Sequence, residues 1–294
     1  METGRLAELK AHSFKLGSNP DLVQGSGGNT SWKSDRTVWV KGSGRRLKDA
    51  TSEEIFSSIN FTALSTEDIL LTQDFSKLTS NDISPSIEAN IHIFLRSPFV
   101  SHLHSLGSIA IGVSERNYEF KTLYENVIFV PYARPGTELV NVISRIEEHE
   151  NKILILQNHG LIISGQESGE IESKIEMFEH QVSEYFTQIL HNEELPNWID
   201  ILTSGVLTPD EAVFLGETPF TKSEEALANS VGINSKGELL FPGKFSVDRV
   251  EIAKFFTRVA KLIERKTSIN YLSKSEVHDL LEWDKEKIRI AMAK

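Results

Sequence analysis

The sequence contains no cysteine among its 294 residues. Disulfides, thiolate zinc ligands and a cysteine nucleophile are therefore excluded. Basic residues are also few, because 31 Lys and Arg face 42 Asp and Glu and leave a formal net charge of −11. Nucleic-acid backbones require a basic protein surface, so no nucleic-acid partner is expected. A small anionic substrate needs only a local cluster of donors and stays compatible with this charge.

Long apolar runs are missing as well. No run approaches the roughly 20 residues that span a bilayer, and residues 1–5 lack the apolar core of a signal peptide. We therefore expect a cytoplasmic protein without a membrane partner. A Gly-x-Gly-x-x-Gly segment after a strand does not occur either, which argues against a dinucleotide-binding half.

What is present fits an ordinary globular protein, with 39% hydrophobic and 25% charged residues. The length allows one large domain with a substantial appendage. We place the boundary at the Leu195–Pro196 step, which gives a body of residues 1–195 and an extension of residues 196–294. In the extension, residue patterns predict helices at about 223–230, 246–264 and 275–292 and strands near 213–215 and 238–241.

In the body, an amphipathic first helix is expected at about residues 5–17, and a helix begins at 136 and runs to about 149. A long core-facing helix is indicated by apolar residues at helical spacing between Ile171 and Ile189. Five histidines fall on predicted polar helical faces or their ends and are assigned no site: His12, His149, His180, His191 and His278.

Three other histidines form a candidate metal site. His102 and His104 lie two positions apart in an extended segment, so both side chains should share one face. His159 follows the apolar run 153–156, which is typical of a buried strand, and stands in Asn-His-Gly where the chain leaves the sheet. A catalytic metal ion typically has three protein ligands and leaves a coordination position open for water or substrate, and three imidazoles would provide this arrangement. On spacing alone, two ordinary histidines and a ligand pair remain open alternatives.

Two glycine-rich turns precede the histidines. Residues 25–31 and 42–44 let backbone N–H groups approach an anion, and Lys33, Lys41, Arg45 and Arg46 lie beside them. A flexible turn is the alternative, and the spacing is not that of a P-loop. Further along, Ser84-Pro85 opens a helix in which Glu88 stands near the first turn, where it can simply complement the helix dipole.

Three segments resemble the class II aldolase/adducin family in the same order: residues 102–105, 130–137 and 157–161. The resemblance covers residues 5–195. It implies an α/β, three-layer fold with a central, mainly antiparallel sheet flanked by helices, plus a smaller C-terminal α/β extension. That extension resembles the one in bacterial aldolase/dehydrogenase fusion proteins, at residues 208–213 and 271–287, without the dehydrogenase.

The resemblance also implies roles. His102, His104 and His159 would hold one divalent cation, with zinc expected, and Glu88 would move a proton. A tyrosine, Tyr118 or Tyr132, would donate a proton to the leaving aldehyde. The turns would bind the substrate's phosphate through these residues: Gly28, Asn29, Ser43, Gly44 and Ser86. Sugar-phosphate aldolases often carry two serines before the glutamate, and the second position here is Ile87, which weakens the phosphate assignment.

The expected activity is that of a metal-dependent aldolase, an aldehyde-lyase. It would cleave or form a carbon–carbon bond in a ketose or ketose phosphate through a metal-stabilised enediolate. An epimerase, dehydratase or decarboxylase acting on a sugar or sugar phosphate would use the same centre. A non-catalytic scaffold, as in adducin, is the third alternative. Adducin lacks the histidine ligands, so their presence here argues against this alternative. Family resemblance further implies a homo-oligomer, with a tetramer expected.

Overall fold

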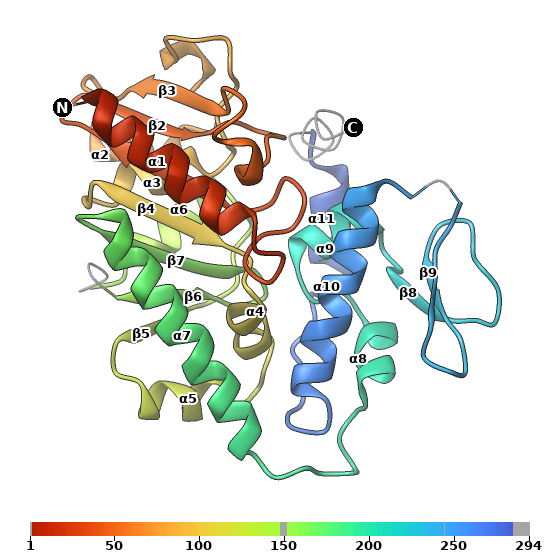
Figure 1. Ribbon diagram of the computed structural model, residues 1–294. Coiled ribbons are helices and arrows are strands. Elements are labelled where there is room, and N and C mark those ends of the chain that lie inside the picture. Colours follow the sequence, from red (N-terminus) through yellow and green to blue (C-terminus); the bar gives the residue numbers. More distant parts are fainter. Residues whose placement is uncertain (1, 148–151, 244, 285–294) are drawn as a thin grey trace.

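The computed structural model describes residues 2–147, 152–243 and 245–284. Its centre is a seven-stranded sheet in the order β3-β2-β1-β4-β7-β6-β5 (Figure 1). The strands are β1 Asn29–Lys33, β2 Thr37–Lys41, β3 Phe56–Asn60, β4 Phe99–Leu103, β5 Val127–Val130, β6 Ile153–Leu156 and β7 Gly160–Gly165. Within this sheet β5 and β6 pair in parallel, and the other neighbours pair antiparallel. The predicted mainly antiparallel central sheet is confirmed.

Helices cover both faces of the sheet (Figure 1). On one face lie α1 Glu2–Gly17, α4 Leu106–Gly112, α5 Asn117–Leu123 and α7 Ser168–Gln188, and on the other lie α2 Thr66–Leu71, α3 Ala89–Phe94 and α6 Thr137–Ile143. The alternation along β4 shows why both faces are covered: Phe99 and Leu103 join the core beneath α1 and α7, whereas Val100 joins the core beneath α3 and α6. The three-layer fold class is confirmed.

The longest helix of the body, α7, follows its sequence pattern closely. Its side chains at helical spacing are buried against the sheet, from Ile171 through Phe178 to Phe186. The prediction for α6 was too long, because the helix ends at Ile143 and a turn follows. Residue 149, where we expected that helix to end, lies outside the described residues.

His12 was predicted on a polar helical face, and this prediction is wrong. Its side chain is buried between α1, α7 and the sheet, with Nδ1 2.8 Å from Glu172 Oε1 and Nε2 2.9 Å from Ser101 Oγ. Burial lowers the pKa of His12. The neutral His12 imidazole thereby links α1 and α7 to β4, on the sheet face opposite to His102. A local sequence pattern does not reveal such a contact.

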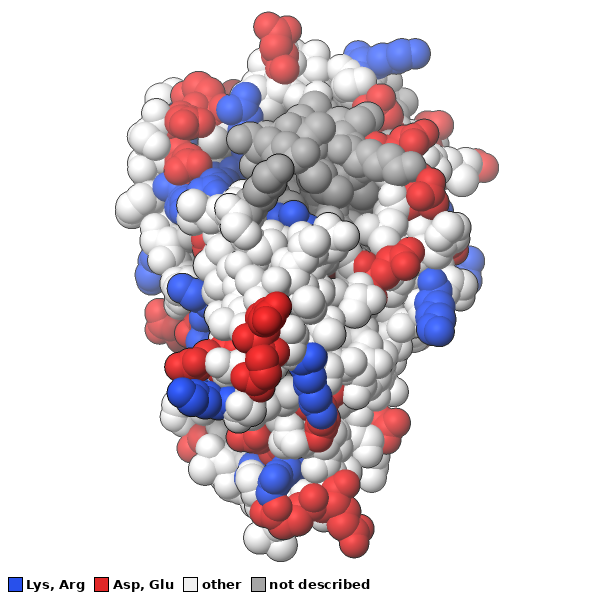
Figure 2. Space-filling model, turned by 90° about the vertical axis from the view of Figure 1, so that its right-hand side faces the viewer, with Lys and Arg blue, Asp and Glu red and all other residues white. Residues whose placement is uncertain are grey.

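The C-terminal part of the chain contains four helices and a small sheet in its described residues. They are α8 Trp198–Ser204, α9 Pro209–Leu215, β8 Phe220–Lys222, β9 Val231–Ile233, β10 Leu239–Leu240, α10 Val247–Ile263 and α11 Lys274–Glu282. The sheet order is β10-β9-β8. Figure 2 shows the side of the molecule on which this part lies, where acidic and basic residues are interspersed among uncharged ones. Two predictions are wrong here. Residues 213–215 end helix α9 instead of forming a strand, and residues 223–230 form no helix. A third prediction, that the last helix reaches 292, is wrong in its length, because α11 ends at Glu282 and Trp283 adopts an extended conformation. The residues after 284 lie outside the described part of the chain.

Helix α10 joins this part to the body. Its apolar stripe, which includes Ile252, Phe255 and Val259, is buried in the same core as side chains of α4 and α7. At the same boundary Arg258 pairs with Asp21 at 2.7 Å. No helix in the described ranges has the length and apolar character needed to cross a membrane. We propose that residues 1–195 form the body and that residues 196–294 are an extension docked on it.

This proposal predicts the behaviour of a shortened chain. A fragment of residues 1–195 should expose the apolar surface that α10 covers, bind a hydrophobic dye such as ANS and aggregate more readily than the full chain. Dye fluorescence and light scattering of the two proteins at equal concentration measure the difference. A monodisperse fragment with unchanged dye binding and full activity would show that the extension is an independent module.

Candidate metal centre

The three predicted histidines lie at or beside the ends of two adjacent strands of the central sheet, β4 and β7. His102 lies in β4, and His104 follows just after its end. His159 lies in the tight turn between β6 and β7, where Asn158 adopts a positive φ of 55°. Because β4 pairs with β7, with His102 opposite Ile162, both histidine segments reach the same end of the sheet. The sheet register therefore brings together residues that are more than fifty positions apart.

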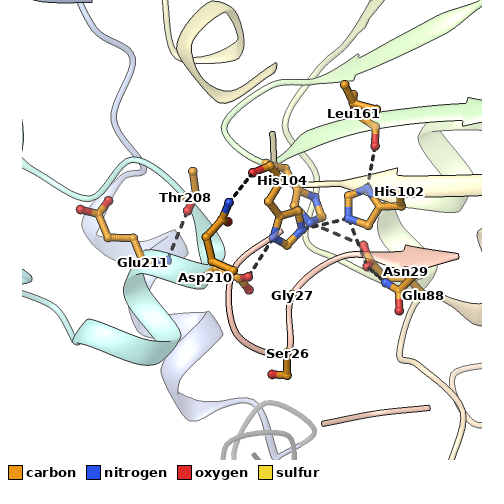
Figure 3. Close-up of polar contacts among 12 residues, drawn as sticks. Ser26, Gly27, Asn29, Glu88, His102, His104, Leu161, Thr208, Asp210 and Glu211 are labelled. Atoms are coloured by element: carbon orange, nitrogen blue, oxygen red, sulfur yellow. Dashed lines mark hydrogen bonds and ion pairs between the residues drawn. The ribbon is translucent and has the colours of Figure 1, made fainter. Parts of the chain in front are cut away.

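The three imidazoles form one buried cluster. Each offers a nitrogen, and these ligand atoms lie within 4.8 Å of one another. The Nε2 atoms of His102 and His104 are 3.0 Å apart (Figure 3). A tetrahedral zinc site with bonds of about 2.0–2.1 Å places its nitrogens roughly 3.3 Å apart, so the spacing fits a bound ion. All three residues are at most 4% exposed, so the cluster is buried.

The outer nitrogens determine which tautomers are present. His102 Nδ1 lies 2.9 Å from the carbonyl oxygen of Leu161, and His104 Nδ1 lies 2.8 Å from Asp210 Oδ2 (Figure 3). A carbonyl only accepts, and an ionised carboxylate only accepts, so each Nδ1 carries the proton and donates it. Both Nε2 atoms then present lone pairs toward each other. Burial lowers the pKa of His102, which disfavours a proton between them.

Glu88 faces this cluster from the start of α3. Its Oε2 lies 3.4 Å from His102 Nε2, and its Oε1 lies 3.6 Å from His159 Nε2. Asn29 Nδ2 donates a 3.0 Å hydrogen bond to Oε2, which Figure 3 shows beside the histidines. The register of β1 and β4 explains the contact, because Asn29 lies directly opposite His102. A carboxylate and two imidazole lone pairs thus converge in one buried place, which favours a cation.

A small cavity of about 10 Å³ lies next to Glu88, about the space for one water molecule. It is lined by both predicted turns, by the glutamate and by one histidine: Ser26, Gly28, Asn29, Lys41, Gly42, Ser43, Gly44, Ser86, Ile87, Glu88 and His104. All five residues expected to contact substrate are in this lining. Their role as substrate ligands remains a proposal.

The basic residues around the two turns have internal partners. Lys41 Nζ donates to the backbone carbonyls of Ser26, Gly27 and Arg45, and Lys33 Nζ donates to the carbonyls at the end of α3. Arg46 pairs with Asp248 at the start of α10. The basic side chains that we expected beside a bound anion therefore also hold the two turns and the extension in place.

Neither candidate tyrosine lines this cavity. The Tyr118 side chain is 63% exposed on α5, and its hydroxyl donates to Glu119 at 3.3 Å. Tyr132 packs against the apolar cluster that Leu272 and Val277 form in the C-terminal part. A proton-donor role for Tyr118 or Tyr132 therefore stays a prediction.

Asp210 is the site residue that sequence reasoning missed. It contacts His104 from 106 positions along the chain. No local spacing links the two residues, and we expected a strand close behind Asp210 where the structure has α9. The one signal in the sequence is Thr208-Pro209-Asp210-Glu211, because a Thr N-cap, a Pro and two acids are typical of a helix start.

The neighbouring Glu211 gives a prediction for stability against pH. Burial raises its pKa from 4.5 to about 8. Between pH 4.5 and about 8 the folded protein keeps the Glu211 proton, which the unfolded chain has released. The contribution of this proton to the unfolding free energy is therefore fully present below pH 4.5 and is lost as the pH rises toward 8. Glu211→Gln should therefore show a flatter pH dependence of the unfolding free energy between about 4.5 and 8. Chemical unfolding at several pH values measures it.

Glu217, exposed just after α9, supplies the matched control. Glu217→Gln should keep the pH dependence of the parent protein. Equal slopes for the parent and the Glu211→Gln protein would contradict the assigned ionisation of Glu211.

Fold and site together define a class of protein: a three-layer α/β body whose central strands end in a buried three-histidine centre faced by a carboxylate. The family model of the class II aldolase and adducin N-terminal domain matches residues 8–186. The chain belongs to this family, which confirms the resemblance seen in the sequence.

Known relatives are similar at low identity. L-fuculose phosphate aldolase of Methanococcus vannielii is 28% identical over 166 residues, which are 53% of this chain and 82% of that protein. The uncharacterized oxidoreductase YuxG of Bacillus subtilis is 26% identical over 215 residues, 64% of this chain. The match spans only 30% of the length of YuxG.

A solved structure agrees with the family assignment. The N-terminal class II aldolase domain of a conserved protein from Thermoplasma acidophilum superposes with a TM-score of 0.50 at 25% identity. The match covers 60% of this chain and 92% of that domain. Nearly the whole Thermoplasma domain therefore has its counterpart in about three fifths of this chain.

Proposed function

We propose that this protein is a metal-dependent aldolase that cleaves or forms a carbon–carbon bond in a ketose or ketose phosphate. The observation that carries the proposal is the convergence of two imidazole lone pairs and the Glu88 carboxylate in one buried place. Such a donor set without a cation would be electrostatically unfavourable. Family membership and the similarity to a fuculose phosphate aldolase support the same reaction class.

His102, His104 and His159 would hold the ion, and zinc is the ion we propose because three nitrogen ligands suit it. A divalent ion held there supplies Lewis-acid stabilisation for negative charge that develops on a substrate carbonyl oxygen. Glu88 would accept a proton on Oε1 while Asn29 keeps Oε2 in place. Within the described residues no hydrogen bond is made to Oε1, which leaves that atom available for the proton.

The two turns would orient the substrate. Gly28, Asn29, Ser43, Gly44 and Ser86 would contact the bound sugar, and their common place in the lining of the cavity next to Glu88 supports this proposal. Because Lys41 and Arg46 already have internal partners, a phosphate would depend mainly on hydrogen-bond donors of the turns. We therefore propose a sugar or sugar phosphate as substrate and let the experiment separate the two.

The decisive experiment uses the zinc-loaded full chain and a panel of free and phosphorylated ketoses. Aldehyde release that a chelator stops and zinc restores is the expected result. Isomer formation without aldehyde would replace the aldolase by an epimerase, and loss of water or carbon dioxide would indicate a dehydratase or decarboxylase. A protein that binds no metal and converts none of the sugars would favour the adducin-like scaffold. Equal activity on matched free and phosphorylated sugars would show that the turns do not select phosphate.

We also propose a homo-oligomer, with a tetramer as the expected state because family resemblance implies it. Light scattering coupled to size-exclusion chromatography measures the mass in solution. A monomer at the concentration used for activity assays would overturn this part of the proposal.

A further inference from the structure

The C-terminal extension reaches the candidate metal centre through Asp210. This carboxylate is only 9% exposed and accepts the hydrogen bond of His104 Nδ1 at 2.8 Å. Figure 3 shows Asp210 approaching from the α9 side, opposite to Glu88. The two carboxylates thus contact the histidine cluster differently: Glu88 faces the Nε2 atoms, whereas Asp210 holds the outer nitrogen of one ligand.

The first turn of α9 holds Asp210 in place. Thr208 Oγ1 accepts a hydrogen bond from Glu211 N at 3.2 Å, and Glu211 Oε2 accepts one from Leu207 N at 2.5 Å. Pro209 adds a fixed φ at the start of the helix. Asp210 lies inside this closed arrangement, so its backbone has little freedom to move away from His104.

Two further contacts connect the extension to the same centre. Asn158, next to His159, donates from Nδ2 to the carbonyls of Leu207 at 2.8 Å and Asn270 at 2.7 Å. Gly27 covers the pair formed by His104 and Asp210 so closely that a Cβ there would lie 2.9 Å from Asp210 Oδ2. Both histidine segments are therefore positioned by residues from the C-terminal part.

We propose that Asp210 is a positioning residue for the metal centre, which makes the extension part of that centre. The inference rests on the proposed metal binding by the three histidines. A carboxylate on the outer nitrogen of a ligating histidine fixes its ring and tautomer and increases the electron donation of the other nitrogen. In the neutral imidazole, Asp210 fixes the proton of His104 on Nδ1, so that the lone pair lies on Nε2 and is directed toward His102 Nε2.

Metal affinity of the full-length protein, measured by competition with a chelating dye, tests this inference. Asp210→Ala should bind Zn²⁺ roughly 10- to 100-fold more weakly, the usual effect of losing such a partner. Asp210→Asn keeps the shape and an acceptor oxygen, and its loss of affinity should be smaller. If the alanine protein does not fold, the asparagine protein decides. The visible spectrum of the Co²⁺-loaded Asp210→Asn protein should differ from that of the parent, because a purely structural role would leave the ligand field unchanged.

Asp200→Asn is the matched control, since Asp200 belongs to α8 of the same extension and pairs with Lys222 at 2.7 Å. It should bind Zn²⁺ like the parent and give the parent Co²⁺ spectrum. Parent-like Zn²⁺ affinity and Co²⁺ spectra in both Asp210 proteins would overturn the positioning role while leaving the metal centre intact. A parent protein that binds neither ion would overturn the proposed metal centre itself, so the two failures are distinguishable.

Discussion

Replacing His102 and His104 together by alanine should reduce bound zinc from about one equivalent per chain to about none after gel filtration. The reason is the geometry of the cluster. Two of the three nitrogens within 4.8 Å of one another would be lost, and His159 would be left as a single imidazole. One neutral nitrogen and a carboxylate form too weak a site for a structural or catalytic zinc ion. Metal analysis of purified protein after incubation with Zn²⁺ measures the loss.

The double replacement also removes two buried hydrogen bonds, so a folding control is needed. His102→Gln with His104→Gln keeps polar atoms near Leu161 and Asp210 and should also lose the metal while giving the parent circular dichroism spectrum. His180→Ala is the matched control, because His180 lies on α7 with a side chain that is 71% exposed. Stoichiometric zinc in a folded double variant would show that these histidines do not form the site.

Local patterns indicated that His102, His104 and His159 could lie together, and family resemblance decided between a metal site and ordinary histidines. A strand exposes alternate residues on one face, and a short apolar run ending in Asn-His-Gly marks the end of a buried strand. Pairing of β4 with β7 then places His102 and His159 close together. The same reasoning found Glu88 only through family resemblance, because a glutamate at a helix start is equally well explained by the helix dipole.

Contacts between distant segments were not predictable in this way. His12 resembles a surface residue in sequence, yet the packing of α1 and α7 buries it beside Glu172. Residues 213–215 are a short apolar run, and such a run does not by itself distinguish a strand from a helix. In the structure it forms the end of α9, which packs on α10. Asp210 reaches His104 only because the extension docks on the body. Burial and docking depend on the whole fold, and a residue's immediate neighbours do not encode them.

Glu88→Gln should leave the fold and most of the bound metal but reduce turnover by roughly 100-fold or more. The amide matches the carboxylate in size, yet it cannot accept a proton. Asn29 Nδ2 would meet the amide oxygen in place of Oε2, so the side chain should keep its position. The effect should therefore appear in kcat, with a smaller change in KM.

Ser86 provides the comparison, because its hydroxyl accepts a hydrogen bond from Glu88 N at 3.2 Å and lines the same cavity. Ser86→Ala changes the surroundings of Glu88 without removing a proton acceptor, and its loss of kcat should be much smaller. Turnover is measured on whichever ketose the panel identifies, with zinc content determined for each protein. Should Glu88→Gln turn over at the parent rate with a full complement of zinc, Glu88 would be a residue of the helix start alone. The proton would then have to be taken by another group, and Asp210, the other buried carboxylate beside the histidines, would be the first to examine.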